Sequence, residues 1–224
     1  MLRLRIRFKR GQELKFISHL DIMRLWIRAL RRAQIPLTYS EGFNPRPRIS
    51  IAAPLSVGVT GENEFMDILV DRPVSPHWLM NTVNRQLPAG IEILEVHPIG
   101  VPVSSLQSQV KSALYRVEVI TGKSRDEIER DISRLLSLEH LQWHHERDTG
   151  RRNYDLRALI ENVEVAECHE GICVLEMKLR CDESGSGRPE QVIYALGFVE
   201  HPKSIHRVKL ILAISGKKKT GALD

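Results

Sequence analysis

The sequence is poor in the residues and runs on which several common protein classes depend. Its 224 residues include three cysteines, and aromatic side chains make up 5% of the chain. No uninterrupted apolar run approaches the roughly 20 residues that span a bilayer. The alternating start MLRLRIRFKR lacks the continuous apolar stretch of a signal peptide. We therefore expect a cytoplasmic protein without a membrane segment.

Motifs that hold common cofactors are also missing. There is no C-x3-C-x2-C pattern for a radical SAM iron–sulfur cluster, and neither the P-loop nor the dinucleotide-binding pattern occurs. Cys168, Cys173 and Cys181 match neither zinc nor iron–sulfur spacing. An odd number of cysteines without a secretion signal argues against a disulfide framework. We expect these cysteines to be small buried apolar residues, and we expect no cofactor and no metal.

Positive charge is in excess near the start of the chain. Residues 1–50 carry 12 basic and 3 acidic side chains, a net +9, whereas the remainder carries 21 basic and 25 acidic ones, a net −4. A positive field concentrated in one part of a chain is typical of a surface that binds a polyanion. The charge distribution therefore indicates RNA as a partner.

Hydrophobic periodicity predicts an α+β fold. Residues 2–9 alternate apolar and basic side chains, as in a strand with one buried and one cationic face. Ser18 begins a predicted helix with Asp21 as a short-armed partner in the cap, and Pro36 ends it. Further strands and a second helix complete the order β-α-β-β-α-β, the ferredoxin-like arrangement.

The second half of the chain shows the same predicted order, although no sequence repeat is visible. We expect two tandem ferredoxin-like domains, at residues 1–103 and 113–215. A polar linker at 104–112 would join them, and a disordered tail at 216–224 would follow. This layout is similar to that of the CRISPR repeat-processing endoribonucleases, a similarity of fold that does not by itself imply function.

Several short segments together resemble a known family. The early ones are Ser18-His19-Leu20-Asp21, Arg31-Arg32-Ala33, Ser40-Glu41-Gly42-Phe43-Asn44-Pro45 and Pro54-Leu55 through Gly58; the later ones are Asp155-Leu156-Arg157 with Leu159-Ile160, and Gly187-Arg188-Pro189-Glu190. They resemble a bacterial family of radical-SAM-associated proteins of unknown function, which occur alone or fused behind a radical SAM enzyme. The resemblance implies a radical SAM enzyme as partner and work in RNA modification, on tRNA or rRNA.

Ser18, His19 and Asp21 have the residue types of a hydrolase triad, but their spacing argues against one. Neighbours on one helical turn rarely let the base bond to both partners, and Ser18 and Asp21 are better explained as the helix cap. Two interpretations of His19 stay open. It is either a partly buried histidine that ties the helix start to the loop, or a general acid or base toward RNA.

The candidate RNA-binding residues lie on the first helix and in the loop that follows it. The helix residues share one face, opposite the apolar stripe, and arginine binds phosphate through two N–H groups. An ordinary solvated face is the alternative. Phe43 either stacks on an unpaired base or anchors the loop in the core. The basic candidates are Arg24, Arg28, Arg31, Arg46 and Arg48.

Candidates in the second half are fewer. Asp155 and Arg157 are predicted to alternate along a strand and to face the same side, as an internal salt bridge or a substrate contact. His140, His144 and His145 lie near a predicted strand, and we expect no metal site there.

The sequence leads to one main hypothesis and two alternatives. The main one is a non-catalytic RNA-binding accessory protein that partners a radical SAM enzyme. The first alternative is a metal-independent endoribonuclease that uses His19. The second is a protein-interaction module whose basic face meets an acidic partner. The oligomeric state is left open.

Overall fold

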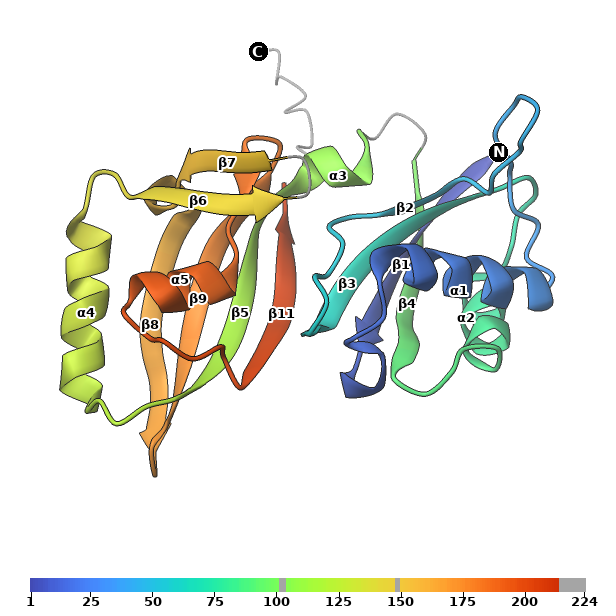
Figure 1. The fold of residues 1–224 in the computed structure, drawn as a ribbon. Coiled ribbons are helices and arrows are strands. Elements are labelled where there is room, and N and C mark those ends of the chain that lie inside the picture. Colours follow the sequence, from blue (N-terminus) through green and yellow to red (C-terminus); the bar gives the residue numbers. More distant parts are fainter. Residues whose placement is uncertain (101–103, 148–149, 214–224) are drawn as a thin grey trace, which may run out of the picture.

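The computed structural model describes residues 1–100, 104–147 and 150–213 and confirms the α+β class (Figure 1). The predicted tail at 216–224 lies outside these residues. Within them, no helix is long and apolar enough to cross a membrane.

The N-terminal half follows the predicted element order. Its strands pair as β2-β3-β1-β4, and every pair is antiparallel. Apolar residues of β1 face helix α1, where the rings of Phe8 and Trp26 meet edge to face at 5.1 Å. Its elements are β1 (Leu2–Arg10), α1 (His19–Arg32), β2 (Ile49–Ile51), β3 (Val59–Val70), α2 (Pro76–Asn84) and β4 (Ile91–Ile99), with a 3-10 turn at Gln12–Leu14.

The C-terminal half pairs its long strands in the order β8-β9-β5-β11, again antiparallel. A separate hairpin of β6 and β7 crosses one end of these strands (Figure 1). The elements are α3 (Leu106–Gln109), β5 (Val110–Ile120), α4 (Arg125–Ser137), β6 (Gln142–Arg147), β7 (Gly150–Asp155), β8 (Ile160–His169), β9 (Ile172–Asp182), β10 (Gly185–Ser186), α5 (Pro189–Ala195) and β11 (Ser204–Leu212), with a 3-10 turn at Arg157–Leu159.

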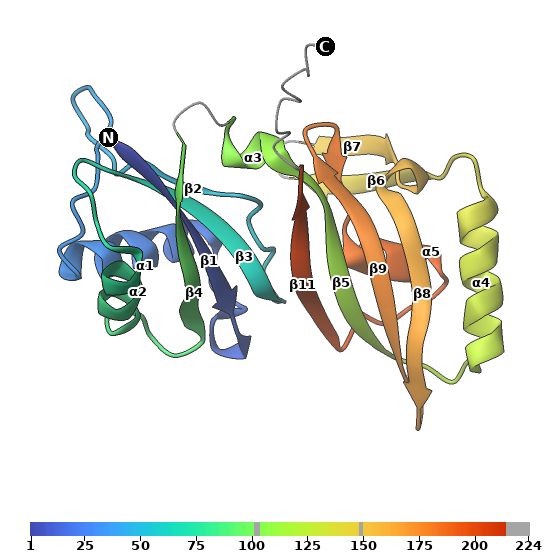
Figure 2. The same ribbon diagram turned by 180° about the vertical axis from the view of Figure 1, so that it is seen from behind.

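One continuous sheet runs through both halves, which the prediction of two separate domains did not include. Strand β11 pairs in parallel with β3, so nine strands belong to a single sheet. The hydrophobic cores nevertheless stay separate, one within residues 4–96 and the other mainly after residue 105. Helices α1, α2 and α5 cover one face, and no helix of the described residues covers the opposite face (Figure 2).

The segment predicted as a linker is folded and packed. Residues 104–112 contain α3 and the first residues of β5, and Leu106 is buried in the C-terminal core. Gln109 accepts a hydrogen bond from Arg5 at 3.0 Å, and Gln107 donates to the carbonyl oxygen of Ile51 at 3.0 Å. The segment therefore bridges the two halves instead of separating them.

A buried ion pair lies at the junction of the halves. The side chains of Arg207 on β11 and Glu64 on β3 are 3% and 1% exposed, and the guanidinium also donates to the carbonyl oxygen of Ala53. The Glu64 carboxylate fills the space in which a side chain at Gly61 would stand. Close by, the Asn63 amide donates to the carbonyl oxygen of Val208 at 2.9 Å.

The prediction of three buried apolar cysteines is wrong: two of them form a disulfide, and the third is free but not fully buried. Cys168 and Cys173 are opposite each other in the β8–β9 ladder and are joined as a disulfide, with a Cα–Cα distance of 4.2 Å. Cys181 is free and partly exposed. Strand register brings the first two sulfur atoms together, and register is not visible in cysteine count or spacing.

We expect Arg207→Met to lower the free energy of unfolding by about 3–5 kcal/mol, because it leaves the Glu64 carboxylate buried without a partner. Urea unfolding measures this loss. The double variant Arg207→Met, Glu64→Leu should recover much of it, since no buried charge then remains. A double variant no more stable than Arg207→Met alone would contradict this account.

Candidate nucleic-acid interface

Helix α1 has an exposed basic face because its apolar side packs in the core. The predicted cap is confirmed: the Ser18 hydroxyl accepts from the Asp21 N–H at 3.2 Å and donates to the Asp21 carboxylate at 2.7 Å. Ile22, Trp26 and Leu30 are buried. The arginines between these apolar positions are therefore turned toward solvent, as the helical periodicity predicts.

The loop after α1 closes into a narrow hairpin that projects from the N-terminal half (light blue in Figure 1). The Arg48 N–H donates to the Thr38 carbonyl at 2.9 Å, and the Ser40 N–H donates to the Arg46 carbonyl at 2.8 Å. At its exposed tip, Gly42 has φ +111°, a conformation that side chains rarely adopt. Asn44 and Pro45 share this exposed tip.

Phe43 stands at this tip with its side chain fully in solvent. Its relative exposure is 107%, so the alternative that it anchors the loop in the core is wrong. An exposed aromatic ring beside arginines provides a face on which an unpaired base can stack.

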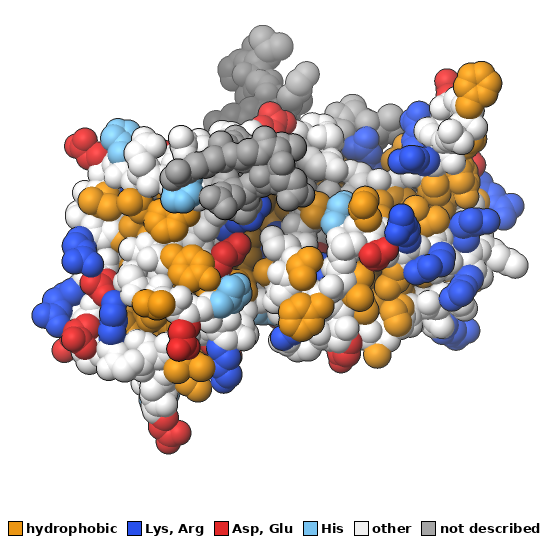
Figure 3. Space-filling model, viewed as in Figure 1, with side chains coloured by type: hydrophobic (Ala, Val, Ile, Leu, Met, Phe, Trp, Pro, Cys, Tyr) orange, Lys and Arg blue, Asp and Glu red, His pale blue; other side chains and the backbone are white. Residues whose placement is uncertain are grey.

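The exposed arginines of α1 and the loop form what we call the α1–loop surface. Arg24 pairs with Asp21 at 2.9 Å. Among the described residues, no carboxylate pairs with the other members. Figure 3 shows basic side chains gathered over α1 with few acidic ones between them. The members are Arg24, Arg28, Arg31, Arg32, Arg46 and Arg48.

The basic side chains of β1 behave differently, although they contribute to the same +9. Arg5 pairs with Asp67 at 2.8 Å, Lys9 pairs with Glu92 at 2.6 Å, and Arg7 pairs with Glu95. The acids come from β3 and β4, outside the counted segment. The side chain of Arg7 lowers the pKa of Glu95 to about 2, so this pair stays charged at neutral pH. The positive field is therefore concentrated on the α1–loop surface.

A groove of about 430 Å³ runs beside α1 on the same surface. Arg28, Arg32, Leu25 and Ala29 line it from α1, and Gln86 lines it from the turn after α2. A charged rim around aliphatic side chains suits a ribose-phosphate strand, whose phosphates need cations and whose sugars tolerate apolar contact.

His19 is exposed, so the prediction of a partly buried histidine is wrong. Its imidazole ring makes no hydrogen bond within the part of the chain that the structure describes. The segment that leads into it is held by Arg10, which is buried at the end of β1 and donates to the carbonyl oxygens of Leu14, Lys15 and Ile17. The backbone before His19 is thus fixed, while its ring has no neighbour that orients it.

Asp155 and Arg157 do not alternate along a strand, which corrects the prediction. Asp155 ends β7, and Arg157 lies in the turn that follows. The Arg157 guanidinium donates to the carbonyl oxygens of Leu136 and Ile160, at 2.9 and 2.8 Å, and so completes the end of α4. The Asp155 carboxylate bonds His140 at 2.7 Å and accepts from the Leu141 N–H at 2.9 Å. The side chains of Asp155 and Arg157 therefore do not pair with each other as a salt bridge.

The described residues contain no cluster of histidine, cysteine, aspartate and glutamate that could hold a metal ion. His140 is paired with Asp155, and the side chain of His145 lies outside the part of the chain that is described.

Arg188 precedes α5, and the buried Pro189 is the first residue of this helix, a position that proline favours. Arg188 and Asp155 both line a cavity in the C-terminal half, together with Tyr154 and Gln191, which the sequence did not single out.

Fold and charge together describe an α+β protein with a basic surface whose arginines, apart from Arg24, have no carboxylate partner in the described part of the chain. The chain belongs to a bacterial family described as "Uncharacterized protein conserved in bacteria (DUF2344)", whose model matches residues 3–189. This agrees with the bacterial family of unknown function that the sequence resembles. The partnership with a radical SAM enzyme stays a prediction. No curated protein matches the chain.

Solved structures with a similar fold share little sequence with the chain. A chain of the "Crystal Structure of a Cbf5-Nop10-Gar1 Complex" has a TM-score of 0.51 and 10% identity, over 93% of this chain and 48% of that one. A chain of the "Structure of H/ACA RNP bound to a substrate RNA containing 2'-deoxyuridine" has a TM-score of 0.47 and 9% identity, over 92% and 46%. The protein thus spans about half the length of these chains, and the first likeness shows the fold alone.

We expect the stability contributed by Asp155 to disappear in acid. The hydrogen bond with His140, and then that with the Leu141 N–H, lower the pKa of the Asp155 carboxyl. A carboxyl with a lowered folded-state pKa stabilises the fold above its ordinary pKa of about 4, and this contribution is lost as pH falls through the lower folded value. In urea unfolding from pH 7 to pH 2.5, the difference between wild type and Asp155→Asn should therefore shrink below about pH 4.

The control for this experiment is Glu183→Gln, which removes an exposed carboxylate from the same half. Its unfolding difference from wild type should stay small at every pH. A stability difference for Asp155→Asn that is unchanged down to pH 2.5 would show that the carboxylate charge does not matter.

Proposed function

We propose that the protein is a non-catalytic RNA-binding accessory protein that contacts phosphates through the α1–loop surface. The observation that carries this proposal is the contrast in pairing. All arginines of the α1–loop surface except Arg24 are exposed without a carboxylate partner among the described residues, whereas three basic side chains of β1 pair with acids of neighbouring strands. Unpaired arginines in fixed positions are available to phosphate without first breaking an ion pair.

The driving force expected at such a surface is the release of counterions from RNA. Each phosphate that an arginine neutralises releases condensed cations, so affinity falls with salt more steeply as more phosphates are neutralised. Phosphate contacts position a protein without reading sequence. Phe43 supplies a different interaction, stacking on an unpaired base, which favours single-stranded regions over duplex.

The proposal includes a partner and an interpretation of the fold. The partner is a radical SAM enzyme that acts on tRNA or rRNA, which rests on the resemblance of the segments between Ser18 and Gly58. The two halves are taken as diverged ferredoxin-like units that meet near residues 98–112. Support comes from the equivalent strand orders, β2-β3-β1-β4 and β8-β9-β5-β11.

The endoribonuclease alternative is less well supported. A general base needs a neighbour that fixes its ring and proton, because efficient proton transfer depends on position. His19 is exposed and has no such neighbour among the described residues. The other alternative is that the α1–loop surface binds an acidic protein instead of RNA. The RNA-binding experiment below distinguishes these two partners.

We expect the double charge reversal Arg28→Glu, Arg31→Glu to weaken binding to all RNA sequences alike. The salt slope of log affinity against log salt should flatten by about one unit for each phosphate that is no longer neutralised. Fluorescence anisotropy with a structured RNA, between 50 and 300 mM salt, measures both quantities. Thermal unfolding should be little changed, since exposed substitutions usually cost within about 0.5 kcal/mol.

The matched control is Arg130→Glu, Arg134→Glu, which makes the same charge change on exposed positions of helix α4. It should leave affinity and salt slope close to wild type. Equal losses in both double variants would mean that net charge alone drives binding. No loss in either would remove RNA from the α1–loop surface and favour the acidic protein.

We expect Phe43→Ala to reduce affinity for single-stranded RNA by about tenfold, since stacking on an aromatic ring contributes roughly 1–3 kcal/mol per base. Affinity for fully paired RNA and the salt slope should be unchanged, because the phenyl ring carries no charge and neutralises no phosphate. Val199→Ala, at another exposed apolar position, is the control. Equal effects of Phe43→Ala on single-stranded and paired RNA would contradict a stacking role.

A further inference from the structure

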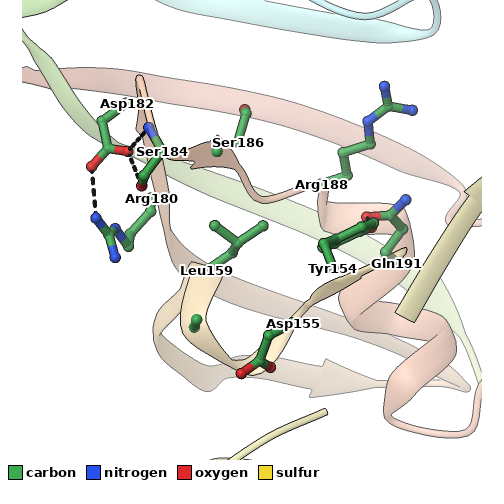
Figure 4. Close-up of a pocket in the computed structure, with 11 residues that line it drawn as sticks. Tyr154, Asp155, Leu159, Arg180, Asp182, Ser184, Ser186, Arg188 and Gln191 are labelled. Atoms are coloured by element: carbon green, nitrogen blue, oxygen red, sulfur yellow. Dashed lines mark hydrogen bonds and ion pairs between the residues drawn. The ribbon is translucent and has the colours of Figure 1, made fainter. Parts of the chain in front are cut away.

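The C-terminal half contains a cavity of about 490 Å³ far from the α1–loop surface. Figure 4 shows two walls with Leu159 between them: Tyr154, Gln191 and Arg188 stand on one side, and Arg180, Asp182 and Ser184 on the other. This volume is within the usual range for small-molecule sites. The cavity is therefore large enough to take a single nucleotide-sized group.

One wall carries a buried amide that is only half used. Gln191 is 6% exposed, and its Oε1 accepts a hydrogen bond from the Tyr154 hydroxyl. Its other amide atom has no partner among the described residues, yet it is not enclosed in the protein. Gln191 lines the cavity, and Figure 4 shows its amide nitrogen turned away from Tyr154. A buried amide with an unused donor is suited to hydrogen-bond a ligand that reaches it.

The surrounding groups match a flat, partly apolar ligand with a polar edge. The ring of Tyr154 lies along the wall, and Leu159 with Ala158 provides aliphatic surface. On the opposite wall, Arg180 is held by Asp182 at 3.0 Å through one nitrogen. The Ser184 hydroxyl and then Arg180 lower the pKa of Asp182 to about 2, so the carboxylate stays charged and keeps the guanidinium in place.

The cavity also brings together segments that are distant in sequence. Asp155 and Leu159 come from one of the two later segments singled out in the sequence, and Arg188 comes from the other.

We propose that this cavity binds one nucleotide, with the base against Tyr154 and Leu159, the free amide atom of Gln191 on the polar edge of the base, and the phosphate toward the guanidinium nitrogens of Arg180 that do not bond Asp182. The nucleotide is either a free nucleoside monophosphate or an unpaired nucleotide of an RNA strand. Both present the same base, ribose and phosphate. The site goes beyond the RNA contact proposed for the α1–loop surface and depends on it only for the second source.

The test uses the full chain and a variant that fills the cavity, Ala158→Trp. Ala158 is exposed at the cavity wall, so the larger ring should be tolerated by the fold. Ser133→Trp, on the exposed side of α4, is the matched control. Titration calorimetry measures binding of uridine and adenosine monophosphate, ribose 5-phosphate and a ten-nucleotide single-stranded RNA, the last at 300 mM salt to suppress phosphate contacts.

We expect Ala158→Trp to weaken binding of a nucleoside monophosphate or of the single-stranded RNA at least tenfold, and Ser133→Trp to leave it unchanged. Binding of the monophosphates would show that a free nucleotide is sufficient to occupy the cavity. Binding of the RNA alone identifies the strand as the source. Gln191→Glu, which keeps the partner of Tyr154 and changes the free atom, should lower affinity; because it places a carboxylate at a buried position, thermal unfolding is measured alongside binding.

Two results would overturn the nucleotide site. One is that neither the monophosphates nor the RNA respond to Ala158→Trp. The other is that ribose 5-phosphate binds as tightly as the nucleotides, which would mean that no base is recognised. The double variant Arg28→Glu, Arg31→Glu should retain monophosphate binding, so failure of the α1–loop surface and failure of the cavity are distinguished.

Discussion

The parallel contact between β11 and β3 is the constraint on which the rest of the structure depends. It spans few residues, and the buried pair of Arg207 and Glu64 reinforces it. Charges taken out of water need matched partners, so this pair allows one registration of the two halves. That registration turns two separately packed cores into one sheet with a bare face and a helical face. The α1–loop surface and the cavity are thereby held in fixed relation, one in each half.

Pairing, not the number of charges, decides where the protein is positive. Five of the basic residues near the start of the chain lie on β1, and three of them pair with acids of neighbouring strands. A cross-strand pair of opposite charges stabilises the sheet, and its field largely cancels at a distance. The helix has no neighbouring strand to supply such acids, so its arginines keep their field. A net +9 in the sequence thus corresponds to a smaller, more localised positive surface in the fold.

The sequence predicts what depends on local order and misses what depends on register. Alternation in residues 2–9 and the cap at Ser18 predict a strand and a helix start because neighbours along the chain determine both. The Cys168–Cys173 bond, the folded segment at 104–112 and the β11–β3 contact each need a partner from elsewhere, so none was predicted. At the candidate site, the basic face follows from helical spacing. The exposure of His19 and Phe43, and the meeting of Tyr154 with Gln191, depend on tertiary packing.

The β11–β3 contact also sets an order on synthesis of the chain. Residues 59–61 of β3 are translated early, whereas their partners at 205–207 belong to β11, the last strand among the described residues. Until β11 leaves the ribosome, this end of β3 has backbone N–H and C=O groups without their final partners, and Glu64 has no Arg207. An open strand edge is a template for pairing with other chains, and chains with such edges are prone to association during folding. The edge of the nascent N-terminal half therefore stays open until residues 205–207 have been synthesised.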